Sequence, residues 1–419
     1  MRGLATEMAP PFVLVAHFFI ASVFFLMVSL GFLPFLFEET GGFFLTPNLA
    51  SFAHLYLLGF VMMVIFGAMY QLVPVVLEVS VFSKDFAYIQ FYMYVVGFVL
   101  LVVGLYTPSL TALIPYGAIL TYVSMLIFCV NIFLTFGELE EINLVGKYLL
   151  VATIFLFISV TLGLFMGLVL GHGLFEINII SWVKAHAVGT LGGFVLMIVS
   201  GVALVLIPMF SLAHNFNDMA SKIAFYLFCI FVPVSIAGYI FEFSKFLIVF
   251  AIFGVAFAVF ATIYQLGLIL AKRVRKQNDY WFKSLVFSFF SLFFSILVWL
   301  ATFFVDIFRL PIVAGFLFCF GFLFPFIVGH IYKILPFLVW YDKFSPLVGK
   351  QKVPMLHDMI HANVADFQFW SMGFAVFAML IGIVFQIYIV FVIGAIVMIF
   401  SGGLVLYNVY YTFTYKIKE

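Results

Sequence analysis

Two histidines in apolar segments offer the clearest metal chemistry in this sequence. His54 and His186 lie 20 and 22 residues before Pro74 and Pro208. A helix rises by about 1.5 Å per residue, so each histidine is expected about 30 Å from its proline, near the same face of a membrane. Imidazoles at one depth on equivalent helices are suited to axial ligation of haem iron. The alternative is that each is an interfacial histidine, hydrogen-bonded to water or to a carbonyl.

A second set of polar side chains lies deeper in the apolar segments. His17 and His330 are each expected about six residues from the cytoplasmic end of a helix, which makes them a second candidate layer for haem binding. Lys333 follows His330 by three residues and shares its helix face. Ionisable groups inside a span are costly and often functional, although a packed histidine and a lysine reaching the interface would also explain them. The same segments carry the polar residues Tyr70, Gln71 and Tyr332.

The remaining metal-ligating residue types give weaker signals. His357 and His361 stand four residues apart, so they would share one helix face and could bind a metal. No glutamate follows His357 directly, and a solvated amphipathic helix is the favoured interpretation. The three cysteines lie inside apolar runs without a CxxC or CxxCH pattern, so the sequence argues against disulfides, thiolate metal sites and covalent haem attachment.

Composition places these residues in a membrane. Hydrophobic residues make up 67% of the 419 residues and charged residues only 8%, whereas soluble domains carry roughly 25% charged residues. Long apolar runs without alternation favour helices over a barrel, because each helix satisfies its own backbone hydrogen bonds in lipid. The sequence therefore predicts an all-α polytopic membrane protein of a cell inner (plasma) membrane, with lipid and not nucleic acid as a partner.

The apolar runs predict twelve transmembrane helices at about 20 residues per crossing. The first run is too long for the core of a signal peptide and has no small-residue cleavage site before Glu38, so it is expected to remain as helix one. We expect the helices near residues 11–37, 50–77, 85–105, 110–135, 147–170, 181–209, 221–241, 246–271, 281–304, 312–340, 364–387 and 389–411.

The loop charges predict that both termini are cytoplasmic. With this helix count, fourteen basic residues fall on one side and only Lys184, Lys245 and Arg309 on the other, as the positive-inside rule requires. The longest polar stretch, residues 341–363, is too short for a soluble domain, so residues 1–419 are expected to form a single transmembrane domain. The fourteen are Arg2, Lys84, Lys147, Lys222, Lys272, Arg273, Arg275, Lys276, Lys283, Lys343, Lys350, Lys352, Lys416 and Lys418.

Three of the expected helices end on one pattern. A glycine precedes a proline by seven residues in segments 67–74, 201–208 and 329–336, and the glycines are 134 and 128 residues apart. Each interval contains four helices, which predicts three four-helix pseudo-repeats at about 1–140, 141–275 and 276–419. Coincidence is the alternative, since glycine and proline are common in membrane helices.

These features resemble the catalytic subunit I of haem-copper oxidases and nitric oxide reductases. Residues 54–60 with 67–74 look like the second helix of that family, which carries a low-spin haem ligand. Residues 185–193 look like its sixth helix, particularly in the non-respiratory branch and in nitric-oxide-response membrane proteins. Residues 329–340 are similar to a motif of bacterial relatives. The resemblance implies a twelve-helix, pseudo-threefold fold and a b-type haem.

The chain departs from that family where the second metal binds. Helix seven of the reductases carries a histidine pair and the outer part of helix ten supplies haem ligands, but residues 220–242 and 309–328 contain no histidine. We therefore expect haem b without copper and no conventional terminal oxidase activity. The expected setting is non-respiratory handling of haem, copper or nitric-oxide stress, by a protein that could form homo-oligomers.

Two other functions stay open at this point. A quinol-linked or nitric oxide reductase-like oxidoreductase could use a rearranged site. A proton-coupled transporter or channel could use His17, His330 and Lys333 to relay protons or bind an anion.

Overall fold

A computed structural model describes residue 8 and residues 10–417 of the chain. Every regular element in that part of the chain is helical. Twelve helices within it are long and apolar enough to cross a membrane. The predicted all-α class and the predicted helix count are therefore confirmed. The chain is a multi-pass membrane protein.

Nine of the twelve spans are built around one α-helix each. The first, α1 (Phe12–Phe32), is extended by a short 3-10 turn (Leu33–Leu36). The other eight are α4 (Lys84–Tyr106), α5 (Leu113–Gly137), α6 (Leu144–His172), α9 (Met219–Ile240), α10 (Lys245–Ala271), α11 (Tyr280–Ala301), α14 (Ala362–Phe385) and α15 (Tyr388–Thr414).

The second, sixth and tenth spans are each interrupted by a π-helical segment, called here the wide turn of that span. Such segments insert an extra residue per turn and are frequent at functional sites. Each wide turn ends twelve or thirteen residues before the repeat proline. This shared feature supports the pseudo-repeats, which stay a prediction. In order, the spans are α2 (Pro47–Tyr56), η4 (Leu57–Met62) and α3 (Met63–Leu77); α7 (Ile179–Ala187), η6 (Val188–Val195) and α8 (Leu196–Ser211); α12 (Leu310–Phe316), η7 (Leu317–Leu323) and α13 (Phe324–Lys343).

The three repeat helices do not all end alike. In spans two and six the fourth residue after the proline, Glu78 or Leu212, adopts a left-handed conformation with φ of 58° or 54°. The following N–H donates to the carbonyl of the proline at 3.2 and 3.0 Å, which closes the helix. Span ten instead continues past Pro336 to Lys343. The prediction that all three helices end on this pattern is therefore wrong for span ten.

Side-chain caps set the starts of spans two and six. Thr46 accepts a hydrogen bond from Leu49 N, and Asn178 accepts one from Ser181 N. Such caps satisfy amide groups that the first turn leaves without helical partners. The two spans consequently begin three and two residues earlier than the apolar runs indicated, at Pro47 and Ile179.

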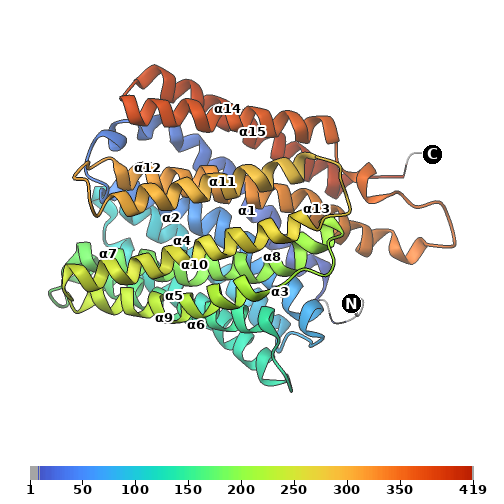
Figure 1. The fold of residues 1–419 in the computed structure, drawn as a ribbon, viewed down its shortest axis with the longest axis horizontal. Helices are drawn as coiled ribbons and strands as arrows, with labels where there is room; N and C mark the ends of the chain where they lie inside the picture. The colour runs from blue at the N-terminus through green and yellow to red at the C-terminus, as the bar shows by residue number, and fades with distance from the viewer. Residues whose placement is uncertain (1–7, 9, 418–419) are drawn as a thin grey trace. The chain divides into compact units, whose positions relative to one another are not determined.

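The chain forms two compact units. The first contains the described residues up to Val15 and Ile65–Lys276, and the second contains Ala16–Val64 and the chain from Gln277 onward. In the first unit α9 and α10 lie side by side, and in the second unit α14 and α15 do so (Figure 1). The second segment of the second unit begins at Gln277, close to residue 276, where the third pseudo-repeat is predicted to begin.

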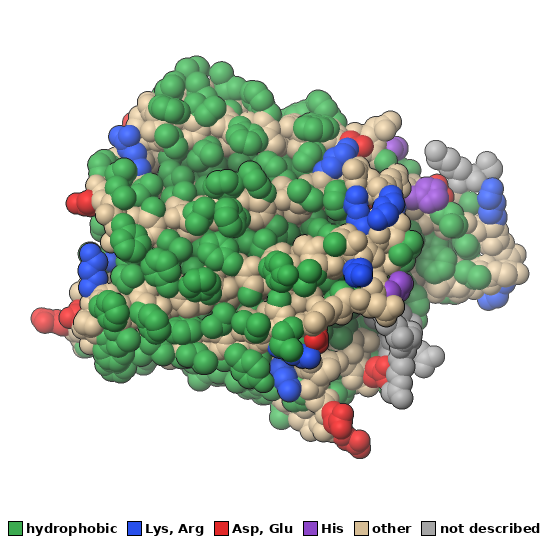
Figure 2. All heavy atoms as spheres, in the orientation of Figure 1, with side chains coloured by type: hydrophobic (Ala, Val, Ile, Leu, Met, Phe, Trp, Pro, Cys, Tyr) green, Lys and Arg blue, Asp and Glu red, His purple; other side chains and the backbone are tan. Residues whose placement is uncertain are grey.

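Apolar side chains cover the outward faces of the helices. Figure 2 shows hydrophobic groups over the visible middle of the helices and charged groups near their ends. Phe257 on α10, Phe290 on α11 and Trp370 on α14 are each more than 60% exposed. Such surfaces suit lipid contact. Two of the fourteen basic residues expected in the cytoplasm, Arg2 and Lys418, lie outside the described residues.

Candidate functional site

His54 lies seven residues into the second span, in the second unit. Its Nδ1 lies 2.7 Å from the backbone carbonyl of Ala50, one turn earlier. A carbonyl only accepts hydrogen bonds, so Nδ1 carries the proton and Nε2 carries the lone pair. Histidines that ligate metals usually donate their other ring N–H to a carbonyl or carboxylate in this way.

His186 has the same tautomer as His54, but its Nδ1–H donates to a carbonyl on another helix. It lies seven residues into the sixth span, in the first unit, and its Nδ1 donates to the carbonyl of Ser159 on α6 at 2.8 Å. A Cβ added to Gly163 would come within 3.0 Å of Cε1 of His186, so the ring lies close against α6. Nε2 of His186 is again the nitrogen with the lone pair.

The wide turn of span six packs closely on α6, and that of span ten on α11. A Cβ on Gly189 would lie 2.2 Å from Oγ of Ser159, and one on Gly321 would lie 2.7 Å from Cβ of Ser291. The two glycine–serine pairs are related by a shift of 132 residues, four more than the 128 residues between Gly201 and Gly329, so they lie about one helical turn out of register. At Gly321 the contact is with Cβ of Ser291 and excludes a larger residue without a shift, whereas at Gly189 the nearest atom is the Ser159 hydroxyl and Cβ of Ser159 would lie 3.4 Å away. Spans six and ten share the glycine–serine contact in kind.

Span ten has no histidine before its wide turn. There the carbonyl of Ala314 accepts a hydrogen bond from Oγ of Ser295 at 2.8 Å. The neighbouring Gly315 faces open space, since an added Cβ would meet nothing within 4 Å. Span ten therefore keeps the wide turn but offers no imidazole at this point.

An aromatic stack joins spans two and ten within the second unit. The rings of Phe52 and Phe320 are nearly parallel at 6.3 Å, and Tyr56 lies 4.9 Å from Phe320. The hydroxyl of Tyr56 donates to the carbonyl of Cys319 in the wide turn at 2.9 Å. The stack thus packs the helix that carries His54 against the wide turn of span ten, and the buried hydroxyl of Tyr56 stays paired.

His330 is buried and engaged on both ring nitrogens. Nδ1 donates to the carbonyl of Phe326 at 2.7 Å, and Nε1 of Trp281 donates to Nε2 at 3.5 Å. The lone pair that a metal would need therefore faces an indole N–H. His17 lies five residues after the start of α1, whereas His330 lies thirteen residues before the end of α13. The expected placement of both about six residues from a helix end is therefore wrong for His330.

Lys333 forms a largely buried ion pair that sequence reasoning missed. Its Nζ lies 2.7 Å from Oδ2 of Asp279, and the two side chains are only 14% and 11% exposed. Asp279 also caps α11 by accepting a hydrogen bond from Phe282 N, and Lys333 lies 5.3 Å from the ring of Tyr280. The lysine is held by a carboxylate from a helix start 54 residues away.

The other polar residues named from the sequence have separate surroundings. The buried hydroxyl of Tyr70 donates to Oε1 of Gln90 at 3.5 Å, and Gln71 is half-buried. The buried hydroxyl of Tyr332 and the side chain of Asn408 interact with each other, although neither that hydroxyl nor Nδ2 of Asn408 makes a hydrogen bond of good geometry within the described residues. Nothing in these contacts assigns Tyr70, Gln71 and Tyr332 to one site.

His357 and His361 do not share a helix. Residues Leu356–Met359 form a single 3-10 turn, and His361 follows it in an extended conformation. The side chain of Asp358 accepts from Met355 N and fixes the turn. The expected amphipathic helix is therefore wrong, and the two imidazoles do not face the same way along a helix. Within residues 10–417 no group of three or more His, Cys, Asp or Glu side chains is placed to hold a metal ion.

Comparison with known proteins identifies the architecture. A cryo-EM structure of a haem-copper terminal oxidase dimer superposes with a TM-score of 0.65, covering 95% of this chain and 85% of that chain. The chain has a haem-copper oxidase-like fold. The two sequences share only 14% identity, so the likeness extends to the fold and not to the chemistry of the oxidase. No family model and no curated protein matches the chain.

Proposed function

We propose that this chain is a haem-binding membrane protein of the haem-copper oxidase superfamily, with His54 and His186 as ligands to haem iron. The observation that carries the proposal is that the two histidines have the same tautomer on this fold. Each donates Nδ1–H to a backbone carbonyl and has its lone pair on Nε2. The donor set fits b-type haem, because neutral imidazole is an axial ligand and no CxxCH segment is present.

The chain's own residues orient and protect these imidazoles. The carbonyls of Ala50 and Ser159 fix the ring planes and the tautomers. The glycine contact at Gly163 leaves no room for the ring of His186 to turn toward α6. Bound haem would supply an iron that changes oxidation state and binds small ligands. His17 and His330 are the second-choice ligands, the latter weakened by its contact with Trp281.

The proposed role is non-respiratory. A second metal held against haem iron needs about three imidazoles fixed on rigid helices. Helix seven, Met219–Ile240, contains no histidine, and helix six offers only His186. We therefore propose handling of haem, copper or nitric-oxide stress rather than rapid reduction of oxygen or nitric oxide.

An optical and chemical test distinguishes this function from its rivals. Purified protein should show a Soret band, sharp α and β bands on reduction, and a pyridine haemochrome of haem b. With a reduced quinol under oxygen or nitric oxide, turnover should be negligible. Sustained turnover on the order of tens per second, with stoichiometric copper or non-haem iron, would replace the proposal with an enzyme.

A proton-coupled transporter is the second candidate. The largely buried pair of Lys333, within span ten, with Asp279, at the start of α11, favours it, because ionisable side chains within spans often mark proton or ion pathways. Protein without any haem, combined with pH-gradient-driven uptake that Asp279→Asn abolishes, would support this candidate over haem binding.

The proposed location is an inner (plasma) membrane with both termini in the cytoplasm. The motivation is the excess of basic residues in alternate loops, including Lys272 and Lys276 between α10 and α11. Reporter fusions at Lys276 should be active only in the cytoplasm. A periplasmic reporter signal at this loop would overturn the orientation.

A further inference from the structure

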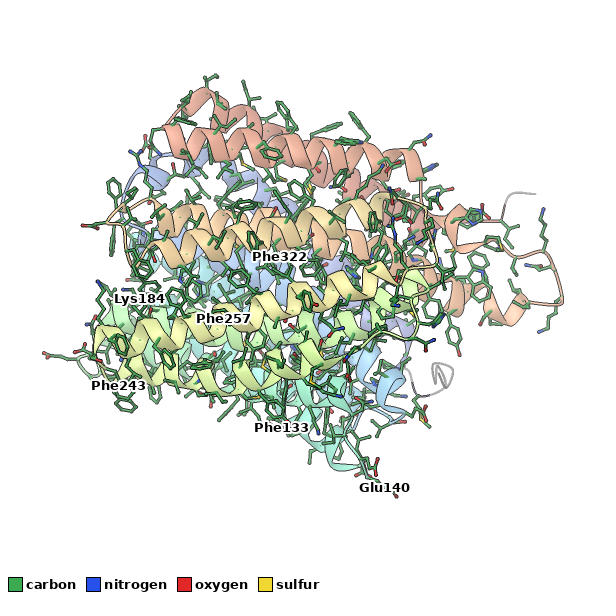
Figure 3. The ribbon with its side chains drawn as sticks, in the orientation of Figure 1. Phe133, Glu140, Lys184, Phe243, Phe257 and Phe322 are labelled. Carbon is green, nitrogen blue, oxygen red and sulfur yellow. The ribbon has the colours of Figure 1, made fainter. Side chains whose placement is uncertain are left out.

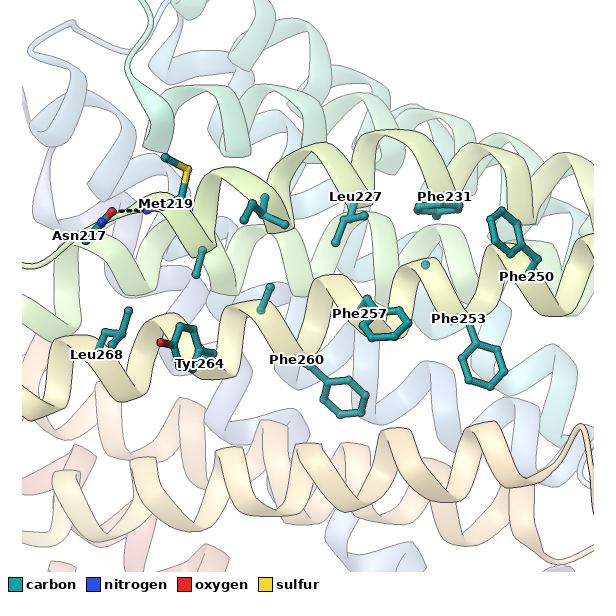
Figure 4. Close-up of a pocket in the computed structure, with 14 residues that line it drawn as sticks. Asn217, Met219, Leu227, Phe231, Phe250, Phe253, Phe257, Phe260, Tyr264 and Leu268 are labelled. Atoms are coloured by element: carbon teal, nitrogen blue, oxygen red, sulfur yellow. Dashed lines mark hydrogen bonds between the residues drawn. The ribbon is translucent and has the colours of Figure 1, made fainter.

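A long groove runs along α9 and α10 in the first unit, with a volume of about 910 Å³ (Figure 4). Met219, Ile223, Leu227 and Phe231 line it from α9 at intervals of four residues. At a rise of about 1.5 Å per residue, the lining from Met219 to Phe231 on α9 extends about 18 Å and the lining from Phe250 to Leu268 on α10 extends about 27 Å, compared with a hydrocarbon core of about 30 Å. The groove is therefore apolar and long enough to hold an acyl chain of a lipid.

Aromatic side chains shape the apolar end of the groove. A Cβ on Gly254 would come within 2.1 Å of Cγ of Phe231, so this phenylalanine can lie across α10 only because residue 254 is glycine. Phe250 packs edge-on against Phe231 at 5.6 Å. Phe257, labelled on α10 in Figure 3, lines the groove and is 61% exposed. A flexible hydrocarbon chain suits such a surface.

The opposite end of the groove is polar and basic. Asn217 and Tyr264 line it there, and Lys272 follows the lining residue Leu268 by four residues. The loop after α10 is attached to the end of α8, because the N–H groups of residues 274 and 275 both donate to the carbonyl of Ser211. Its cations are therefore kept close to the mouth of the groove.

Charge at this end is strongly one-sided. Residues 211–222 and 264–276 contain five basic side chains and one acidic side chain, Asp218, which pairs with Lys222 at 2.9 Å. Lys272 and Lys276 are exposed. A basic patch at the end of an apolar groove between transmembrane helices is an arrangement that recognises anionic lipid headgroups.

We propose that the α9–α10 groove binds an anionic phospholipid, with one acyl chain along the groove and the phosphate beside Lys272 and Lys276. The proposal does not depend on haem binding. The apolar length selects a lipid over free phosphate, and the positive mouth selects an anionic over a zwitterionic headgroup.

Native mass spectrometry of the delipidated full-length protein tests this with phosphatidylglycerol and phosphatidylcholine as probes. Wild type should retain phosphatidylglycerol preferentially. Lys272→Gln with Lys276→Gln should weaken its binding by about 30-fold, since each cation near a membrane surface contributes about a factor of five. Ala261→Trp, which fills the groove, should abolish it.

Matched variants control for charge and bulk. Lys350→Gln with Lys352→Gln, in the exposed loop after α13, and Ile230→Trp, on α9 outside the groove lining, should leave retention unchanged. Equal retention of both lipids, or unchanged phosphatidylglycerol binding in both groove variants, would overturn the proposal. So would extraction of a quinone, or a dimer that Ala261→Trp dissociates, because either would identify a different occupant.

Discussion

Spans six and ten use the same backbone for different chemistry. Both contain a wide turn, and in both a glycine of that turn contacts a serine on the preceding helix of its unit. Span six places His186 just before the turn, where its ring bonds to α6. Span ten has Ala314 near the same place, and its carbonyl accepts a serine hydroxyl instead. The wide turn is therefore a packing feature, and the side chain before it decides whether the span can bind a metal.

The two spans also differ in how they are anchored beyond the wide turn. Near Gly201, span six contacts α6 through Tyr148, whereas span ten is fixed to α11 by the Lys333–Asp279 ion pair and the Trp281–His330 contact. At this point span six is held against α6 by close packing, whereas span ten is held against α11 by charge and a hydrogen bond. Span six has its own hydrogen bond to α10, where the hydroxyls of Ser200 and Thr262 lie 3.2 Å apart. Substitutions at these anchors test this difference.

The largest expected effect is on the charged anchor of span ten. Asp279→Asn should lower the free energy of unfolding by about 3–5 kcal/mol, because it leaves the Lys333 ammonium largely buried without its partner. Denaturant unfolding in detergent micelles would measure this. The matched control is Asp366→Asn, whose partner Lys283 is more exposed, with an expected cost of about 1 kcal/mol or less. Equal costs would show that burial of the pair is unimportant.

The glycine contacts should matter in both spans. Gly189→Val and Gly321→Val each force a side chain into a serine on the neighbouring helix, and overpacking typically costs about 1–3 kcal/mol. Gly315→Ala, where an added Cβ meets nothing, is the control and should be neutral. Thermal unfolding of the purified variants would measure the ranking. Wild-type stability of Gly189→Val would break the equivalence of the two wide turns.

The smallest expected effect concerns the indole contact. Trp281→Phe keeps an aromatic ring but removes the donor to Nε2 of His330, which should cost about 1 kcal/mol. Trp299→Phe on the same helix is the comparison variant. If Trp281→Phe lowers the free energy of unfolding no more than Trp299→Phe does, the Trp281–His330 hydrogen bond does not contribute to stability.

The fold was largely predictable because apolar run length and loop charge depend on local sequence. The wide turns were not predictable, because packing against neighbouring helices determines where a π-helical segment forms. The glycines within residues 189–193 indicate only that close packing occurs there. The partner of Lys333 was also missed. An acidic residue before an apolar run suggests an N-cap, but only the tertiary structure brings Asp279 to a lysine 54 residues away.

The candidate ligands His54 and His186 were predicted from their spacing in the sequence, whereas their tautomers could be assigned only from the hydrogen bonds in the structure. Span ten shows the limit of spacing arguments. His330 was expected about six residues from a helix end because it lies six residues before Pro336, but α13 continues to Lys343, thirteen residues after His330. Near that helix end Trp340 Nε1 donates to the carbonyl of Pro354 at 2.7 Å, a contact that the spacing of residues does not predict.

The central claim is that His54 and His186 ligate haem iron, and low-temperature electron paramagnetic resonance of the oxidised protein tests it most directly. Wild type should give a low-spin ferric signal. His54→Ala and His186→Ala should each lose haem or convert it to a high-spin signal that added imidazole reverses, while His357→Ala, at an exposed side chain, should match wild type. Full haem occupancy with an unchanged low-spin signal in both His54→Ala and His186→Ala would contradict the assignment.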